Sequence, residues 1–148
     1  MLSTLSIKEV VKTLENKWFL YKPESDVGLL EKNFNHHFPK DYIYFLEQLG
    51  EGSYSFKDFM FNSWCSASIV EDNQEYMIAE SLGKDFVAIG TDGGGICFCL
   101  DFRNKEETSL VCVGLGDLDV NEVRFLANTF TKALQMMLEE KITLEEIL

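Results

Sequence analysis

The chain has 148 residues, of which 46% are hydrophobic and 13% aromatic, and its formal net charge is −12. This length and apolar content predict a single folded domain over 1–148 and exclude intrinsic disorder. The negative charge opposes binding to nucleic-acid phosphates and to anionic membranes. The start of the chain lacks a secretory signal, and no apolar run reaches about 18 residues, so we predict a cytosolic protein.

The negative charge is distributed unevenly. Residues 1–50 hold 6 basic and 7 acidic side chains, whereas residues 51–148 hold 7 and 18. Such a field would steer a basic protein toward the chain, but acidity of this kind also keeps a protein in solution without any partner. Charge alone leaves both interpretations open.

The beginning of the chain predicts two short amphipathic helices. Ser6 and Glu9 have the spacing of a capping box, and apolar residues recur behind them at helical intervals, so a helix is expected over 5–16. The run Trp18–Tyr21 is either a brief strand or a plug beneath a sheet. Asp26 is a candidate N-cap for a second helix with an apolar inner face.

The next segment predicts a helix with sharply defined ends. Pro39 suits the first helical position or the one before it, because its φ is fixed and it lacks an N–H. Gly50 can adopt the left-handed conformation that ends a helix. Apolar residues lie between them on one face: Tyr42, Phe45, Leu46 and Leu49.

The middle of the chain predicts mostly strands. Alternating aromatic residues indicate one or two strands over 53–64, and another strand is expected over 108–113. Residues 66–81 predict one polar, acidic helix with an imperfect apolar face.

A glycine-rich turn joins two further predicted strands, 86–89 and 96–100. The pair Asp92-Gly93 tolerates the positive φ of a tight hairpin turn. The run 90–95 lacks the lysine and the following helix of a phosphate-binding loop, so a hairpin is the better interpretation.

The end of the chain predicts a long helix from Asp119 to Leu138, because Asp119 and Glu122 have capping-box spacing and apolar residues follow. A short tail helix is expected over 141–146, with Thr143 as its cap. Helices thus gather at both ends and strands in the middle. We therefore predict an α+β fold with a central, mostly antiparallel sheet, N-terminal helices and a long C-terminal helix.

The four cysteines are predicted to be free thiols with a structural role. Cys97 and Cys99 would lie on one face of a strand, and neither Cys65 nor Cys112 completes a second close pair. A set of four metal ligands is therefore absent from the pattern. We predict no zinc or other metal, and no cofactor.

The patterns of catalytic sites are absent as well. The only histidines, His36 and His37, are adjacent and lack the spacing of a zinc-binding helix, and the sequence contains no Gly-x-Ser-x-Gly elbow. Asp92 and Asp101 flank the hairpin without an evident desolvating partner, so turn formation explains them better than acid–base catalysis.

A second acidic group, Asp117, Asp119 and Glu122, lacks the glycine and the final glutamate of an EF-hand loop. Helix capping and interaction with the helix dipole explain these residues. We therefore predict that the chain is not an enzyme.

Several segments together match, in order, the motifs of one protein family. Phe38, Pro39, Asp41 and Tyr42 match the family's opening motif, in which an apolar residue, a proline, an acid and an aromatic residue precede a short helix. Residues 86–101 resemble its strand, glycine turn, strand and final aspartate, contributed here by Asp92, Gly93, Gly94, Gly95 and Asp101.

Weaker similarity extends the match in the family's order. Trp64, followed by Ile69, Asn73 and Tyr76, resembles the family's connecting segment, and 121–138 resembles its closing helix. The resemblance therefore covers roughly 26–138. On these motifs the chain resembles the SMI1/KNR4 family, also called the SUKH superfamily, and the resemblance implies a SUKH-like domain.

The resemblance also implies a function. Bacterial members of the superfamily are often immunity proteins, which neutralise a toxin domain, frequently a nuclease, by stoichiometric binding. The alternative is a scaffold or regulatory adaptor, as in fungal members that act in cell-wall and stress signalling and carry long flanking regions. A small-molecule-binding domain or an enzyme is a third possibility.

Charge alone nominates contacts for a basic protein partner: Asp58, Glu71, Asp72 and Glu75. Exposed charges of this kind act chiefly on the rate of association. The identity of the partner and the oligomeric state do not follow from the sequence.

Overall fold

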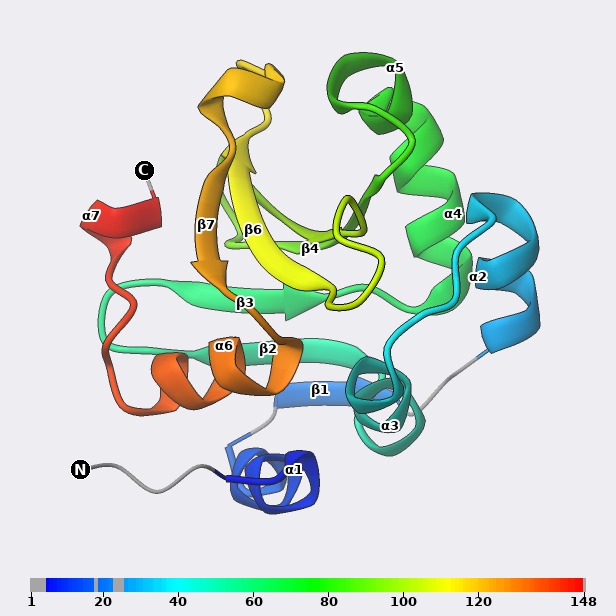
Figure 1. The fold of residues 1–148 in the computed structure, drawn as a ribbon. Coiled ribbons are helices and arrows are strands. Elements are labelled where there is room, and N and C mark those ends of the chain that lie inside the picture. Colours follow the sequence, from blue (N-terminus) through cyan, green and yellow to red (C-terminus); the bar gives the residue numbers. More distant parts are fainter. Residues whose placement is uncertain (1–4, 18, 23–25, 148) are drawn as a thin grey trace.

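The computed structural model describes residues 5–17, 19–22 and 26–147 (Figure 1). Its centre is one sheet of seven strands in which each strand pairs with the next one along the chain. All six pairings are antiparallel. With helices packed around this sheet, the predicted α+β fold is confirmed.

The strands are β1 (Phe19–Lys22), β2 (Glu51–Ser55), β3 (Met60–Ser63), β4 (Phe86–Thr91), β5 (Ile96–Asp101), β6 (Ser109–Gly114) and β7 (Arg124–Ala127). The helices are α1 (Ile7–Glu15), α2 (Val27–Phe34), α3 (Lys40–Gln48), α4 (Ser66–Glu75), α5 (Ile78–Leu82), α6 (Phe130–Leu138) and α7 (Leu144–Ile147), and a 3₁₀ turn, η1, spans Val120–Glu122.

The predictions for the beginning of the chain are confirmed. Ser6 and Glu9 form the expected capping box at the start of α1. Asp26 caps α2, where its carboxylate accepts a hydrogen bond from the backbone N–H of Leu29 at 3.0 Å. Between these helices β1 pairs with β2, so the open choice at 18–21 is decided in favour of a strand, although Trp18 itself lies outside the described residues.

The helix with sharply defined ends is α3. Pro39 stands just before its first residue with φ −64°, and Gly50 ends the turn with φ 63°. Tyr42 and Phe45 are fully buried and each lies edge-to-face against Phe130 of α6, with ring centroids 5.0 Å apart. These contacts join α3 to α6.

The two faces of the sheet carry separate apolar clusters, because alternate residues of a strand point to opposite faces. We call the face that carries Phe98 and Cys112 the inner face, and its cluster includes residues of α1, α3 and α6. The outer face carries Cys97, Cys99 and Val111, and α5 packs against it. In Figure 1, α6 lies in front of β2, α1 and α3 lie at the bottom of the view, and α5 lies at the top.

The predicted helix over 66–81 is wrong as a single element. It divides into α4 and α5 at Met77, which has φ 55°. The reason is geometric, because a straight helix turns by about 100° per residue and would put Ile78 on the side opposite to Ile69. Both residues are fully buried, so the chain must bend between them.

The predicted long helix over 119–138 is also wrong. Its first part forms η1 and β7, and only α6 is helical beyond them. Asp119 caps η1 alone, whereas α6 has its own N-cap in Thr129, whose hydroxyl accepts a hydrogen bond from the N–H of Lys132 at 3.0 Å. The intervening segment pairs with β6, where Leu126 and Ala127 are buried. The tail helix is α7.

The predicted hairpin joins β4 and β5. Gly93 adopts φ 83°, and the carboxylate of Asp92 accepts hydrogen bonds from the N–H groups of Gly94 at 2.9 Å and Ile96 at 3.0 Å. The aspartate therefore contributes its side chain to the turn, while the glycine contributes its backbone freedom.

Replacing Gly93 by Val should destabilise the chain by about 1–3 kcal/mol, because a β-branched residue is strained at positive φ. The added Cβ would also lie 3.0 Å from Nδ2 of Asn62. Urea denaturation gives the free energy of unfolding, with Gly95→Val as the control, since Gly95 has no positive φ and open space around its Cα. Equal effects of the two substitutions would contradict the assignment of the turn.

Candidate functional site

The aspartate of the opening motif joins two helices. One carboxylate oxygen of Asp41 accepts a hydrogen bond from the N–H of Tyr42 at 2.8 Å. The other oxygen accepts from the N–H of Thr131 at 2.9 Å and from its hydroxyl at 2.7 Å. Asp41 therefore satisfies backbone donors at the N-termini of both α3 and α6, and its role is structural. Phe38 extends this scaffold, with its ring 5.2 Å from that of Phe102.

The aspartate at the end of β5 holds an arginine. Asp101 accepts hydrogen bonds from Nε of Arg103 at 3.1 Å and from Nη2 at 2.8 Å. These hydrogen bonds raise the pKa of Arg103, whose guanidinium lies 4.7 Å from the ring centroid of Phe86. Since Asp101 and Phe86 are partners in the sheet, the three residues close one end of the hairpin.

In the connecting segment, the side chain of Asn73 makes the hydrogen bonds that a neighbouring strand would otherwise make to β4. Asn73 of α4 is buried and exchanges two hydrogen bonds with the backbone of Ala88, at 2.8 and 2.9 Å. Trp64 packs against both apolar clusters and stacks on Tyr76, with ring centroids 6.5 Å apart. Both side chains thus attach the connecting segment to the sheet.

Both histidines make contacts with nearby groups. Nε2 of His36 lies 2.9 Å from the carbonyl oxygen of Lys84, and its ring stacks on Phe102 with centroids 4.3 Å apart. Nδ1 of His37 lies 3.6 Å from a carboxylate oxygen of Glu31. Both histidines therefore serve local packing and surface contacts.

The cysteines are free thiols, and three of them are buried: Cys97, Cys99 and Cys112. The Sγ atoms of Cys97 and Cys99 lie 3.8 Å apart on the outer face, and their hydrogen bond, together with burial, raises the pKa of Cys99. Burial raises the pKa of Cys112 to about 12. In the described part of the chain, His, Cys, Asp and Glu form no group of three that could hold a metal ion.

Alkylation of the folded chain at about pH 8 should modify Cys65 alone, because the thiolate is the reactive form and the other three thiols are buried. Mass spectrometry of the intact chain should show one added group, and four after unfolding in urea. An unfolded thiol has a pKa of about 8.5, whereas Cys112 in the folded chain has a pKa of about 12. Between these two pH values unfolding releases the proton of Cys112, so the free energy of unfolding falls as the pH rises. Rapid labelling of two or more thiols before unfolding would contradict this prediction.

Three of the four charge-nominated contacts lie together on α4. Burial raises the pKa of Asp72, and repulsion by Glu71 and Glu75 raises it further. No ion pair within the described part of the chain involves any of these three carboxylates. We call them the α4 acidic strip. Asp58 is not part of it, because it lies in the β2–β3 connection, on the opposite side of the molecule from α4 (Figure 1).

An exposed apolar pair follows the α4 acidic strip directly. Tyr76 is 42% exposed and Met77 is 55% exposed, at the point where the chain bends into α5. Aromatic and methionine side chains are enriched at protein-binding surfaces. The sequence predicts that this pair belongs to a helix. The signal for the exposed pair is two large apolar residues directly after a polar, acidic run.

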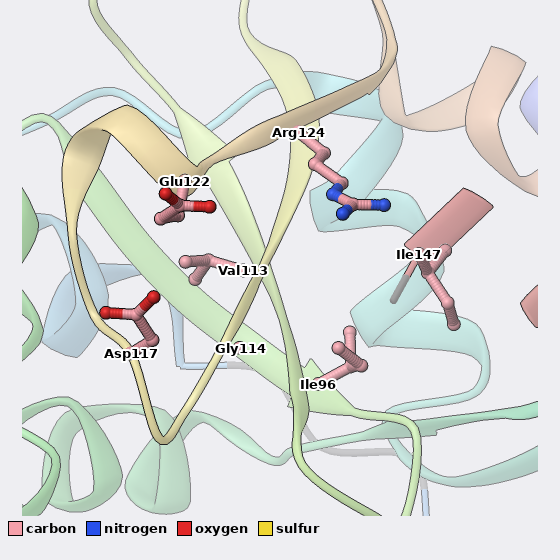
Figure 2. A pocket seen from close by; sticks show the side chains of 7 residues that line it. All are labelled: Ile96, Val113, Gly114, Asp117, Glu122, Arg124 and Ile147. Carbon is pink, nitrogen blue, oxygen red and sulfur yellow. The ribbon is translucent and has the colours of Figure 1, made fainter. Parts of the chain in front are cut away.

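A second feature is a hollow of about 180 Å³ at the ends of β5 and β6. Figure 2 shows the carboxylates of Asp117 and Glu122 on one side of Val113, and Arg124 on the other side, near Ile147. The sequence predicts capping and helix-dipole roles for Asp117, Asp119 and Glu122. Asp119 has such a role, whereas Asp117 and Glu122 line the hollow.

These observations define an α+β domain whose motif side chains are engaged in its own structure and whose acidic and apolar side chains gather on its surface. None of the described helices is long and apolar enough to cross a membrane. The model of the SMI1 / KNR4 family (SUKH-1) matches residues 23–136, and the chain belongs to this family. A comparison with curated proteins finds no match.

Proposed function

We propose that this chain is an immunity protein that neutralises a basic toxin domain by binding it in a stoichiometric complex, without turnover. Membership of the SMI1 / KNR4 family (SUKH-1) supports a protein-binding role of this kind. The observation that carries the proposal is the α4 acidic strip, which lies beside the exposed side chains of Tyr76 and Met77.

The electrostatics of the strip favour a cationic partner. The raised pKa of Asp72 means that its charged form is disfavoured in the free chain, first by burial and then by Glu71 and Glu75. A Lys or Arg side chain of a partner would replace this repulsion by attraction. Tyr76 and Met77 would add the apolar contact that a charged rim alone does not supply.

The test uses a candidate toxin domain encoded next to this chain, which we expect to be basic. Its expression should stop growth, and co-expression of this chain should restore growth. The purified pair should form a one-to-one complex by calorimetry. If co-expression does not restore growth and calorimetry detects no complex, the proposal is overturned and the scaffold or adaptor function becomes the better interpretation.

A charge-reversed variant tests the surface. Changing Glu71, Asp72 and Glu75 to Lys should slow association by about tenfold or more at low salt, because the three side chains steer the encounter. Rising ionic strength should reduce the difference from wild type. Glu47→Lys is the control, since Glu47 is an exposed residue of a different helix, α3. Equal association rates for all variants would remove the strip from the interface.

Replacing Asp72 by Asn should change stability and binding in opposite directions. A carboxylate whose folded pKa is raised opposes folding at neutral pH, and the opposition is relieved as pH falls, so the neutral amide should raise the melting temperature slightly. Loss of one attractive charge should weaken partner binding by about twofold to fivefold. Thermal unfolding and calorimetry measure the two effects. A lower melting temperature at neutral pH would contradict the prediction.

A further inference from the structure

The chain itself shows how a carboxylate and an aromatic ring can hold one arginine together. Asp101 accepts hydrogen bonds from Arg103 at 2.8 and 3.1 Å, and the same guanidinium lies 4.7 Å from the ring centroid of Phe86. A guanidinium suits both contacts, because it is planar, carries a fork of donors and stays charged. The end of α4 carries a carboxylate and an aromatic ring as well, in Asp72 and Tyr76, but no arginine.

Asp72 and Tyr76 are neighbours on one turn of a single helix. They are four residues apart, a spacing that puts their Cβ atoms about 5–6 Å from each other. The backbone N–H of Tyr76 donates to the carbonyl oxygen of Asp72 at 2.9 Å, so the helical turn between them is intact. The carboxylate and the ring therefore share one continuous patch of surface.

The ring of Tyr76 is supported on one side and open to solvent elsewhere. It lies nearly parallel to the ring of Trp64, with centroids 6.5 Å apart and 11° between the planes, and Trp64 packs against both apolar clusters. Tyr76 is still 42% exposed, and no other ring or cation in the described part of the chain contacts it. A ring held in this way can receive a planar cation at a small cost in side-chain entropy.

The carboxylate of Asp72 has no cation of its own. None of the ion pairs between described residues includes it. The sequence contains two arginines, of which Arg103 is engaged at the hairpin and Arg124 lies in β7. Partial burial and the other two acids of the α4 acidic strip raise the pKa of Asp72, so an approaching cation would relieve an unfavourable charge.

We propose that an arginine of the basic partner completes this site, with its guanidinium stacked on the ring of Tyr76 and hydrogen-bonded to the carboxylate of Asp72. The inference rests on the proposed function and names the residue with which the toxin domain makes this contact. Lysine would serve less well. Its ammonium is a compact, strongly hydrated charge that has neither a planar face to stack on the ring nor a fork that matches the carboxylate.

Two replacements of Tyr76 distinguish stacking from simple apolar contact. Tyr76→Phe keeps the aromatic face and should bind within about twofold of wild type, whereas Tyr76→Leu keeps apolar surface only and should weaken the complex by about fivefold to tenfold. Calorimetry with the candidate basic domain encoded next to the chain measures both at one salt concentration. Tyr44→Leu is the matched control, because it makes the same chemical change on a different helix, α3, and it should bind as wild type does.

A double-mutant cycle tests whether one partner residue contacts both side chains. Asp72→Asn and Tyr76→Leu are measured singly and together. The double variant should lose clearly less affinity than the product of the two single losses, because an arginine that has lost one contact holds the other less well. Two losses that simply multiply would overturn the bridging arginine.

The partner's side of the contact is tested by changing the surface arginines of the basic domain to lysine, one at a time. One of these changes should weaken binding to the wild-type chain by about fivefold or more and have little further effect on binding to Tyr76→Leu. Since the change is made in the partner and measured first on the wild-type chain, this measurement decides the matter if Tyr76→Leu melts early.

The outcomes separate the two proposals. Failure of the wild-type chain to bind the basic domain overturns the proposed function and this inference with it. Binding that weakens when the α4 acidic strip is charge-reversed but is unchanged in Tyr76→Leu overturns only the inference. An equal loss in Tyr76→Phe and Tyr76→Leu also overturns it, because the contact would then belong to the hydroxyl group. A scan in which no change of arginine to lysine weakens the complex has the same consequence.

Discussion

Replacing Phe45 by Ala should lower the free energy of unfolding by about 3–5 kcal/mol, the cost of removing an aromatic ring from a packed core. The ring has no exposed surface and lies where α3, α6 and β3 meet. Its centroid is 5.0 Å from that of Phe130, in an edge-to-face arrangement, and 6.2 Å from that of Phe61. Removing the ring would take these contacts away from both α6 and β3. Because three elements would surround the cavity, the site has little freedom to collapse around it.

Urea denaturation measures this loss, with Phe125→Ala as the matched control. The chemical change is the same, but the ring of Phe125 is 65% exposed, so its removal should change stability by about 0.5 kcal/mol or less. A Phe45→Ala chain that unfolds like wild type but no longer binds the partner would contradict the core assignment. The ring would then belong to an interface.

The helix α3 could be predicted because its signals are local and agree with one another. Pro39 fixes the backbone before the first turn, and Gly50 supplies the left-handed residue after the last one. The apolar stripe between them faces the core. Neither end depends on how distant parts of the chain pack, so the sequence pattern sufficed.

The segment 119–138 could not be predicted in the same way. Its apolar residues fit a helix, but the part between η1 and α6 forms β7 and pairs with the edge of β6. Pairing with β6 is a long-range contact, and tertiary context overrides helix propensity there. The available local sign was Thr129, a favoured N-cap residue, whose position divides the predicted helix.

The candidate surface was predictable only in part. Charge identified Glu71, Asp72 and Glu75, because neighbouring residues of a helix remain neighbours in space. Charge alone also grouped these residues with Asp58, which the fold puts on the opposite side of the molecule. Nothing in the sequence indicated that α5 and the β6–β7 connection pack on the same face of the sheet.

The side chain of Asn73 performs the work of a strand residue. β3 pairs with β4 through Asn62–Thr91 and Ser63–Gly90, and the N–H of Trp64 donates one more hydrogen bond to the carbonyl of Ile89 at 3.0 Å before the chain leaves the sheet to enter α4. Beyond that point, the N–H of Ala88 donates to Oδ1 of Asn73 at 2.9 Å, and its carbonyl accepts from Nδ2 at 2.8 Å. An amide side chain carries the same donor and acceptor as a peptide group, so it can continue the ladder.

Replacing Asn73 by Ala should therefore cost about 2–5 kcal/mol, because a buried N–H and a buried C=O of Ala88 would lose their partners. Asn33→Ala is the matched control. Like Asn73, the exposed Asn33 donates to the carbonyl four residues earlier, at 2.8 Å, but it binds no strand. Urea denaturation should separate the two variants. In hydrogen exchange, the amide of Ala88 should lose protection in Asn73→Ala and keep it in Asn33→Ala. Unchanged protection of that amide in Asn73→Ala would mean that another group satisfies β4, and that α4 is attached to the sheet by apolar contacts alone.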